Sequence, residues 1–243
     1  MYKIMFFWMI ATLLAFFVKG LCGFANTLVF TTILSFGNSN IDISPVELIL
    51  GYPTNAILAY KERKSIQWKI CLPLSLLVLM GSLPGILFLK NADVKFIKII
   101  FGILIVMIGI EMFLRESRFK QMKQSKFVLG LLGILSGILC GLYGVGALLG
   151  AYVSRVTDDS HSFKANICIV FLVENTFRII MYALWGILTY PIVIQAVKLV
   201  PFMLAGLFLG IESGRVLDEK IVKKAVIVML ILSGAALIMN NVI

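Results

Sequence analysis

The stretch SGILCGLYGVGALLGAYV (residues 136–153) is apolar and interrupted by closely spaced glycines. Glycine adopts φ > 0 and lets another backbone come close, so a helix can break here and expose unpaired N–H groups. The apolar arms around this break, 127–141 and 142–156, are each 15 residues long. A helix needs about 20 apolar residues to cross a bilayer. The stretch therefore predicts two short helices joined at a glycine tip within a membrane.

The rest of the chain has the same apolar character. Of its 243 residues, 60% are apolar and 14% are charged, and the mean hydropathy is +1.03. A soluble domain has about 45–50% apolar and about 25% charged residues, so the surplus requires lipid as solvent. This composition excludes soluble enzymes, coiled coils and disordered tails, and the continuous apolar runs disfavour a membrane β-barrel. We predict an all-α polytopic membrane protein.

A second glycine tip occurs near the N-terminus, in GLCGFAN (residues 20–26). An offset of 121 residues places it on GLYGVGA (residues 141–147), and the first and fourth residues of both stretches are then glycine. An offset of 125 places 81–109 on 206–234 and matches both glycines and loop charges. Internal duplication of this kind is common in membrane transporters. The chain is thus predicted to contain two copies of one transmembrane unit.

The apolar runs repeat the same order, a close pair of short helices followed by three long ones. The predicted helices are 4–18, 20–36, about 45–60, 69–89, 95–114, 127–141, 142–156, about 165–187, 191–212 and 221–241. The predicted domains are residues 1–114 as the first transmembrane repeat, 115–126 as a basic cytoplasmic linker, and 127–243 as the second transmembrane repeat.

Charge counting predicts the orientation of the two copies. The linkers 61–69, 115–126, 155–164 and 214–224 hold 15 of the 22 lysines and arginines, whereas the opposite set of loops holds four. Cytoplasmic loops carry the excess of Lys and Arg. Equivalent loops then fall on opposite faces, so the two repeats have inverted topology. Whether the short pairs cross the membrane fully or are re-entrant stays open, because the parity is odd in both cases.

The glycine tips are the first candidate site. A helix N-terminus that opens into a wet cavity binds anions through free N–H donors and the helix dipole. Alternatively, the glycines only let helices pack closely. The candidate substrate-binding residues are Gly20, Gly23, Phe24, Asn26 and Thr27 at the first tip, and Gly141, Gly144, Val145 and Gly146 at the second.

The second candidate is ENTFR (residues 174–178), inside the apolar run 167–185. Ionisable side chains at such depth cost at least about 2.5–3.5 kcal/mol each. Glu174 and Arg178 are four residues apart and can simply pair. Alternatively, Arg178 offers its donors to an oxyanion beside Asn175, with Asn55 in the matching stretch of the first copy, and Glu174 couples transport to protons.

The remaining polar residues suggest no other chemistry. Lys19 either snorkels to an interface or lines the pathway, and Glu47, Glu111, Glu212 and Lys198 lie near segment ends, where interfacial or structural roles are expected. The four cysteines occur without a CxxC pattern, so no metal site and no cofactor are expected. No Walker A, HExxH or GxSxG sequence occurs, so the chain is predicted not to be an enzyme and to work by a secondary mechanism.

The tips GLCGFANTLVF and SGILCGLYGVGALLGAYV, the basic linker and the Asn-containing helix after the second tip resemble the TauE/SafE sulfite exporter family, also called the toluene-sulfonate uptake permease family. The resemblance covers essentially the whole chain. The usual second tip of that family reads more like GxGGG with a proline following, whereas here Ala147 and Leu148 replace glycines and no proline follows. The resemblance implies transport of sulfite, sulfonates or related small anions across the bacterial inner membrane, driven by the proton gradient.

These observations together predict alternating access around a midplane anion site. The expected partners are a small anionic substrate and the lipid bilayer, with no nucleic acid; a homodimer is left open. A passive anion channel and a non-transporting assembly subunit are the alternatives. The sequence shows no selectivity-filter signature for the former.

Overall fold

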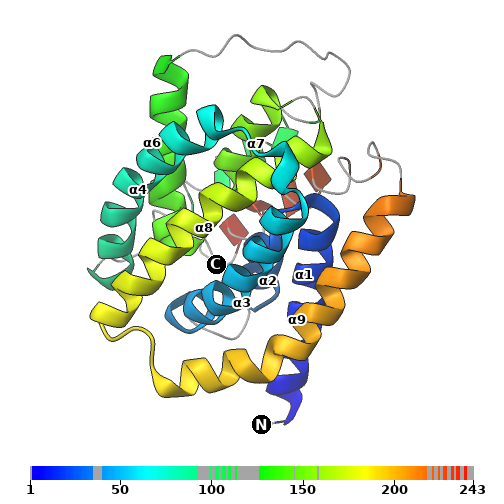
Figure 1. Ribbon diagram of the computed structural model, residues 1–243. Coiled ribbons are helices and arrows are strands. Elements are labelled where there is room, and N and C mark those ends of the chain that lie inside the picture. The colour runs from blue at the N-terminus through cyan, green and yellow to red at the C-terminus, as the bar shows by residue number, and fades with distance from the viewer. Residues whose placement is uncertain are drawn as a thin grey trace.

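The described residues of the computed structural model are 2–34, 40–91, 126–144, 146–157 and 159–217, with scattered positions between 99 and 113 and between 221 and 239. Their elements are all helical. In chain order they are α1 (Tyr2–Cys22), α2 (Asn26–Leu34), α3 (Asn40–Lys61), η1 (Arg63–Ser65), α4 (Trp68–Asn91), α6 (Lys126–Tyr143), α7 (Ala147–Val156), α8 (Ser160–Leu184) and α9 (Tyr190–Val216) (Figure 1). The predicted segments 95–114 and 221–241 lie largely outside the described residues.

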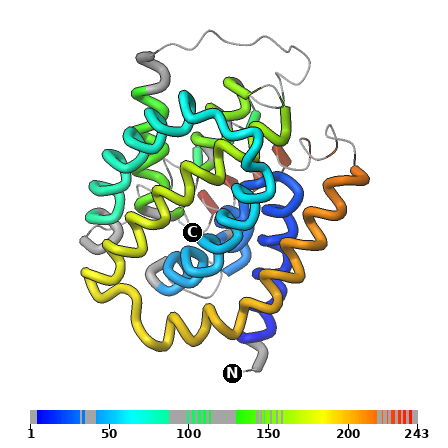
Figure 2. Tube along the Cα trace, in the orientation of Figure 1, coloured from blue at the N-terminus to red at the C-terminus, as the bar shows by residue number. Residues whose placement is uncertain are grey.

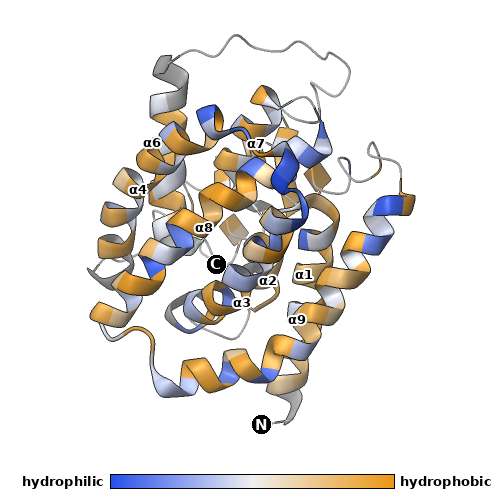
Figure 3. Cartoon of the chain, in the orientation of Figure 1, coloured by the Kyte–Doolittle hydropathy of each residue, from blue (hydrophilic) through white to orange (hydrophobic). Residues whose placement is uncertain are grey.

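Four of these helices are long and apolar enough to cross a membrane: Met5–Cys22, Trp68–Leu87, Ser160–Leu184 and Tyr190–Val216. Figure 3 shows that the helices consist mostly of apolar residues, and many of the large ones are exposed. On α4, Leu72, Leu76, Met80, Leu83 and Leu87 are all exposed, at helical spacing along one face. An exposed apolar stripe of this length on a helix long enough to span a membrane is typical of a lipid-facing surface. The chain is therefore an all-α polytopic membrane protein, as predicted.

The helix pairs at the tips differ from the predicted pairs of equal short arms. α1 is 21 residues long and continues through Gly20, whereas α2 has only nine residues. Gly20 is helical because its role is close packing, and the chain breaks three residues later at Gly23 (φ 84°) and Ala25 (φ 70°). The second break comes at Gly144 (φ 69°), between the 18-residue α6 and the 10-residue α7. Each pair is thus a long helix followed by a short one.

Two helix crossings depend on glycine, and they match each other. In the α4–α6 crossing, a Cβ on Gly81 would lie 2.1 Å from the Ile134 carbonyl oxygen. In the α1–α9 crossing, a Cβ on Gly206 would lie 2.4 Å from the Leu13 carbonyl oxygen. Gly206 and Leu13 are the residues that the offsets of 125 and 121 assign to Gly81 and Ile134. The two crossings therefore use equivalent residues. In each, the glycine comes from one copy and the carbonyl oxygen from the other, and the copies change roles between the two crossings.

The directions of the helices follow from these contacts. Along α1 and α9 the contacting residues increase together, as they do along α4 and α6, so both pairs are parallel. By contrast, α3 and α8 are antiparallel, since Ser44 contacts Tyr182 at 3.2 Å and Tyr52 contacts Thr176 at 3.3 Å. Figure 2 shows the two parallel pairs flanking α3 and α8. Because α3 and α8 are equivalent helices, this is the arrangement that inverted copies require; the membrane topology itself stays a prediction.

Helix ends from the predicted cytoplasmic loops gather at one end of the molecule. Glu62, after α3, pairs with His161 of α8 at 2.8 Å. The backbone N–H of Gln67 donates to the side-chain oxygen of Asn166 at 2.8 Å. Lys61 lies close enough to Arg215 and Lys164 for their charges to act on it. Residues 115–125 of the linker are outside the described part, so the division into 1–114, 115–126 and 127–243 stays a prediction.

Candidate functional site

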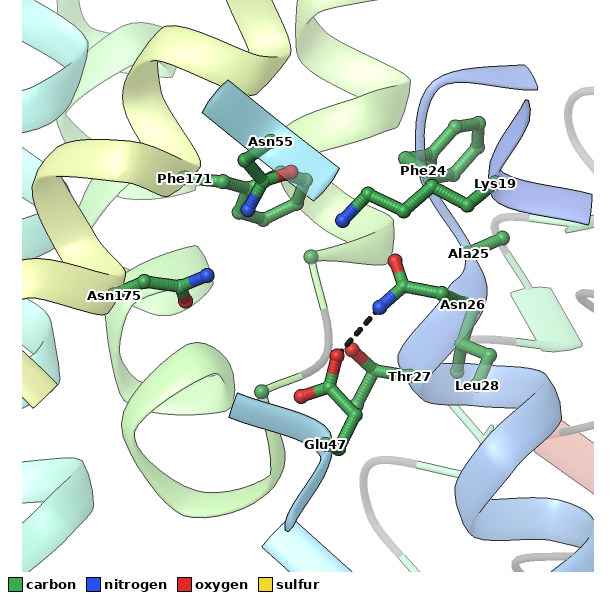
Figure 4. Close-up of a pocket in the computed structure, with 12 residues that line it drawn as sticks. Lys19, Phe24, Ala25, Asn26, Thr27, Leu28, Glu47, Asn55, Phe171 and Asn175 are labelled. Atoms are coloured by element: carbon green, nitrogen blue, oxygen red, sulfur yellow. Dashed lines mark hydrogen bonds between the residues drawn. The ribbon is translucent and has the colours of Figure 1, made fainter. Parts of the chain in front are cut away.

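A narrow cavity lies where the two glycine tips meet α3 and α8. It has room for little more than a water molecule. Its lining comes from both halves of the chain (Figure 4): Lys19, Phe24, Ala25, Asn26, Thr27, Leu28, Glu47, Asn55, Gly144, Gly146, Phe171 and Asn175.

Two helix N-termini border this cavity. The first bond at the start of α2 runs from the Val29 amide to the Ala25 carbonyl, so the amides of Asn26, Thr27 and Leu28 have no acceptor within the helix. At the start of α7 the first bond runs from Gly150 to Gly146. Free amides and aligned peptide dipoles give both ends a partial positive charge. Both helices thus direct the end that favours anions toward one space.

The glycines of the second tip allow close approach of side chains. A Cβ on Gly144 would lie 2.6 Å from Arg178 Nη1. A Cβ on Gly146 would overlap the Phe171 ring. Gly144 also has φ of 69°, which side chains other than glycine rarely adopt. The tip is therefore shaped by its neighbours from α8 and not only by its own turn.

A buried ion cluster lies behind Gly144. Arg178 Nη2 is 3.4 Å from Glu47 Oε2, and Nη1 is 4.0 Å from Glu174 Oε1. Nη1 also donates to the Cys140 carbonyl at 2.6 Å, and Ser82 is 3.5 Å from Glu174. These ion-pair side chains are 1–4% exposed. Arg178 is therefore shared between two carboxylates, one from each half, and does not line the cavity.

Glu47 connects the cavity to this cluster. One carboxylate oxygen accepts from the Asn26 side-chain amide at the start of α2, and the other faces Arg178. Because α3 begins at Asn40, Glu47 lies two turns inside the helix and is 3% exposed. Of the interfacial and structural roles expected for Glu47, this burial excludes the interfacial one. The predicted helix began near residue 45, which put Glu47 in its first turn.

Lys19, Asn55 and Asn175 extend their polar ends into the same space (Figure 4). Lys19 is 1% exposed, which excludes snorkelling, and its ammonium makes no hydrogen bond or ion pair within the described part of the chain. The Asn55 Oδ1 atom is buried and likewise lacks a partner among the described residues. Unsatisfied polar groups around one cavity indicate a site built for a polar ligand.

The cavity brings together many of the residues that the sequence suggested. Phe24, Asn26, Thr27, Asn55, Gly144, Gly146 and Asn175 line it. Glu174 and Arg178 lie behind it; Gly20 and Gly141 lie in the helix crossings; Gly23 packs against the Lys164 stem. Val145 lies outside the described residues. Ala25, Leu28, Glu47 and Phe171 were missed, and Lys19 was left between two roles.

Comparison with known proteins identifies one family. The family model described as sulfite exporter TauE/SafE matches residues 8–237, nearly the whole chain. No curated protein and no solved structure matches significantly.

Proposed function

This chain belongs to the sulfite exporter TauE/SafE family, and from that premise we propose that it is a secondary transporter of small sulfur-containing or organic anions such as sulfite or sulfonates. The family and the membrane-spanning helices make it a multi-pass membrane protein of a transporter family. The observation that carries the proposal is the cavity where the N-termini of α2 and α7 meet. Its lining is rich in donors, and oxyanions accept hydrogen bonds.

The anion is bound by groups of both halves. The amides at the start of α2 and α7 supply backbone donors, and the Asn175 side chain supplies another from α8. Asn26 already donates to Glu47, so its contribution is to hold the tip in place. A site at the interface between two copies can open to either side of the membrane when one copy moves relative to the other.

Glycine packing suggests which parts move together in alternating access. A Cβ on Gly210 would lie 2.1 Å from the Phe17 carbonyl oxygen, and one on Gly137 would lie 2.2 Å from the Val78 carbonyl oxygen. Backbones this close do not slide without a large cost. The rigid units are therefore α1 with α9 and α4 with α6, each composed of one helix from each half, and they rock around α3 and α8.

Proton coupling is assigned to Glu174. Arg178 is shared between Glu174 and Glu47, so a proton on Glu174 leaves Arg178 paired with Glu47 alone. A changed pairing between α3 and α8 alters the cavity wall, because Glu47 is part of it. The Arg178 guanidinium approaches the anion only in a state where this pairing is released.

The orientation follows from the distribution of charge. The proposal puts the basic linker 115–126 in the cytoplasm, which its excess of Lys and Arg supports, and the chain in the bacterial inner membrane.

Flux measurements on the purified chain in proteoliposomes test this function. We expect saturable sulfite flux that rises with an imposed pH gradient. Arg178→Gln should abolish the flux, Glu174→Gln should retain flux that no longer responds to the gradient, and Lys198→Gln, at an exposed position on α9, should behave as wild type. Flux that ignores the gradient in the wild type would indicate a passive channel. No anion flux at all would reject the transporter and favour an assembly subunit.

A further inference from the structure

From the cavity lining we infer that Lys19 is the residue that contacts the negative charge of the transported anion, and that the site takes a small oxyanion without a large substituent. This inference rests on the proposed function and extends it to a residue and a substrate class. Arg178, the cation that sequence reasoning placed in the site, is instead held by two carboxylates behind Gly144.

Lys19 has no ion-pair partner within 4 Å in the described part of the chain, and the charge of Glu47 across the cavity acts on it only from farther away. The side chain is 1% exposed, yet its ammonium has no hydrogen-bonding or ion-pair partner in the described part of the chain. Burial of an unpaired ammonium costs several kcal/mol. Figure 4 shows the side chain extending into the cavity toward Asn26 and Asn55. A ligand that supplies a negative charge is what this arrangement lacks.

The charged side chains around the cavity balance one another in number. Lys19 and Arg178 carry two positive charges, and Glu47 and Glu174 carry two negative ones. The N-termini of α2 and α7 each add about half a positive charge, and the C-termini of α1 and α6 at the same tips each add about half a negative charge. The position of Lys19 in the cavity, and not an excess of positive charge, is what favours an anion there.

The size of the cavity limits the substituent on the anion. Phe24 and Phe171 contribute apolar walls, and the enclosed space is close to that of one water molecule. A sulfur oxyanion of a few heavy atoms fits after a small expansion. An aromatic sulfonate requires that the rings of Phe24 and Phe171 move apart.

The two copies support a specific role for Lys19. With the offset of 121 that aligns the glycine tips, the equivalent of Lys19 is Cys140. The helix pairs α1–α9 and α4–α6 pack in the same manner around these positions. The packing of these helix pairs therefore does not require a lysine. The charge of Lys19 is instead explained by its place in the cavity, where it can contact an anion.

Thermal unfolding of the purified full-length chain in detergent, with sulfite, methanesulfonate or toluenesulfonate added, tests the inference. Binding to the folded state raises the melting temperature. We expect sulfite to stabilise the wild type most and toluenesulfonate least. Lys19→Met should weaken sulfite binding about tenfold or more, the range for a hydrogen bond to a charged group. Lys19→Arg should retain more of the binding, and Lys198→Met should retain all of it.

Each other outcome has a defined meaning. Without anion, Lys19→Met should melt at or above the wild-type temperature, because it removes an unpaired buried charge. An unfolded Lys19→Met protein would make Lys19 structural and overturn the inference, as would unchanged sulfite binding in a folded one. Equal stabilisation by toluenesulfonate would overturn the size limit. If the wild type neither binds nor transports any of the three anions, the proposed function itself is rejected, and the assignment of Lys19 with it.

Discussion

The two glycine tips have similar backbones but different side chains. In both, a long helix ends at a glycine with positive φ, Gly23 or Gly144, and a short helix follows. The first tip adds Lys19 and Asn26, where the offset of 121 gives Cys140 and Ala147 in the second. Backbone geometry is thus repeated, whereas charge is not.

The same contrast holds between α3 and α8. At the offset of 121, Glu47 corresponds to Cys168, and Arg178 corresponds to Ile57. Each of the two acidic and two basic residues near the cavity therefore corresponds, at this offset, to an uncharged residue of the other copy. The repeat provides a symmetric scaffold that can open both ways, and the departures from the repeat provide the chemistry. The following predictions test the two parts of this comparison.

The largest effect is expected at the repeated helix crossings. Gly81→Val and Gly206→Val should each prevent recovery of folded protein, because their Cβ atoms would lie 2.1 Å and 2.4 Å from carbonyl oxygens of the facing helix. The cost exceeds the about 1–3 kcal/mol of ordinary overpacking. Size-exclusion chromatography in detergent measures it. Gly130→Val is the control, since no atom lies within 4 Å of its Cβ position. If only one of the two valine variants prevented folding, the two helix crossings would not be structurally equivalent.

The ion cluster should show the next largest effect and no symmetry. Arg178→Met leaves Glu47 and Glu174 buried without a counter-charge and should destabilise the protein by about 3–5 kcal/mol. Ile57→Met, at the equivalent position, should cost less than about 1.5 kcal/mol. Thermal unfolding in detergent compares them. Adding Glu47→Gln and Glu174→Gln to Arg178→Met should restore part of the loss. If it does not, Arg178 stabilises the fold by packing and not by charge.

The glycines of the two tips should separate stability from transport. Gly23→Ala and Gly144→Ala each force alanine into a left-handed conformation, at a cost of about 1–2 kcal/mol. We expect similar losses of melting temperature, since both positions share this strain. Only Gly144→Ala should reduce sulfite flux strongly, because its Cβ would displace Arg178, whereas that of Gly23 meets the flexible Lys164 stem. Equal losses of flux would show that both tips contact the anion path alike.

The smallest effect is expected at the start of α8, outside the membrane span. The Asp159 carboxylate accepts from the backbone amide and the hydroxyl of Ser162 at 2.8 Å, and these hydrogen bonds lower the pKa of Asp159. Its stabilisation is therefore complete above the unfolded-state pKa and is lost as the pH falls through the lower folded-state pKa. Asp159→Ala should cost about 1 kcal/mol at neutral pH.

Asp159→Asn is the matched control for this cap. Its amide oxygen still accepts from Ser162, so most of the stability should remain, but the acid-dependent part should disappear. Melting temperatures measured from neutral to acidic pH compare the three proteins. If the wild type and Asp159→Asn lose stability equally on acidification, other carboxylates account for the loss.

The sequence predicted the architecture because apolar runs and glycine positions are local signals. The all-helical membrane fold, the break at each tip and the polar residues Asn26 and Asn175 could be identified in this way. The end of α1 was misplaced because Gly20 has no local mark that separates a packing glycine from a turn glycine. Only the facing α9 backbone distinguishes them.

The ion cluster could not be predicted from the sequence in full. Arg178 was recognised as deeply placed, and its neighbour Glu174 was an evident partner at four residues. The second partner, Glu47, is 131 residues away and belongs to the other half. Its depth became apparent only with the true start of α3. The orientation of Lys19 toward the cavity likewise depends on how α1, α3 and α8 pack together.

Anomalous diffraction from crystals soaked with selenite is the most direct test that an anion binds where the halves meet. Selenite has the shape and charge of sulfite, and selenium gives a signal that sulfur and oxygen do not. We predict a selenium peak in the cavity, within hydrogen-bonding reach of the amides that begin α2 and α7. An empty cavity at a selenite concentration that blocks sulfite flux, with selenium bound elsewhere, would contradict the account.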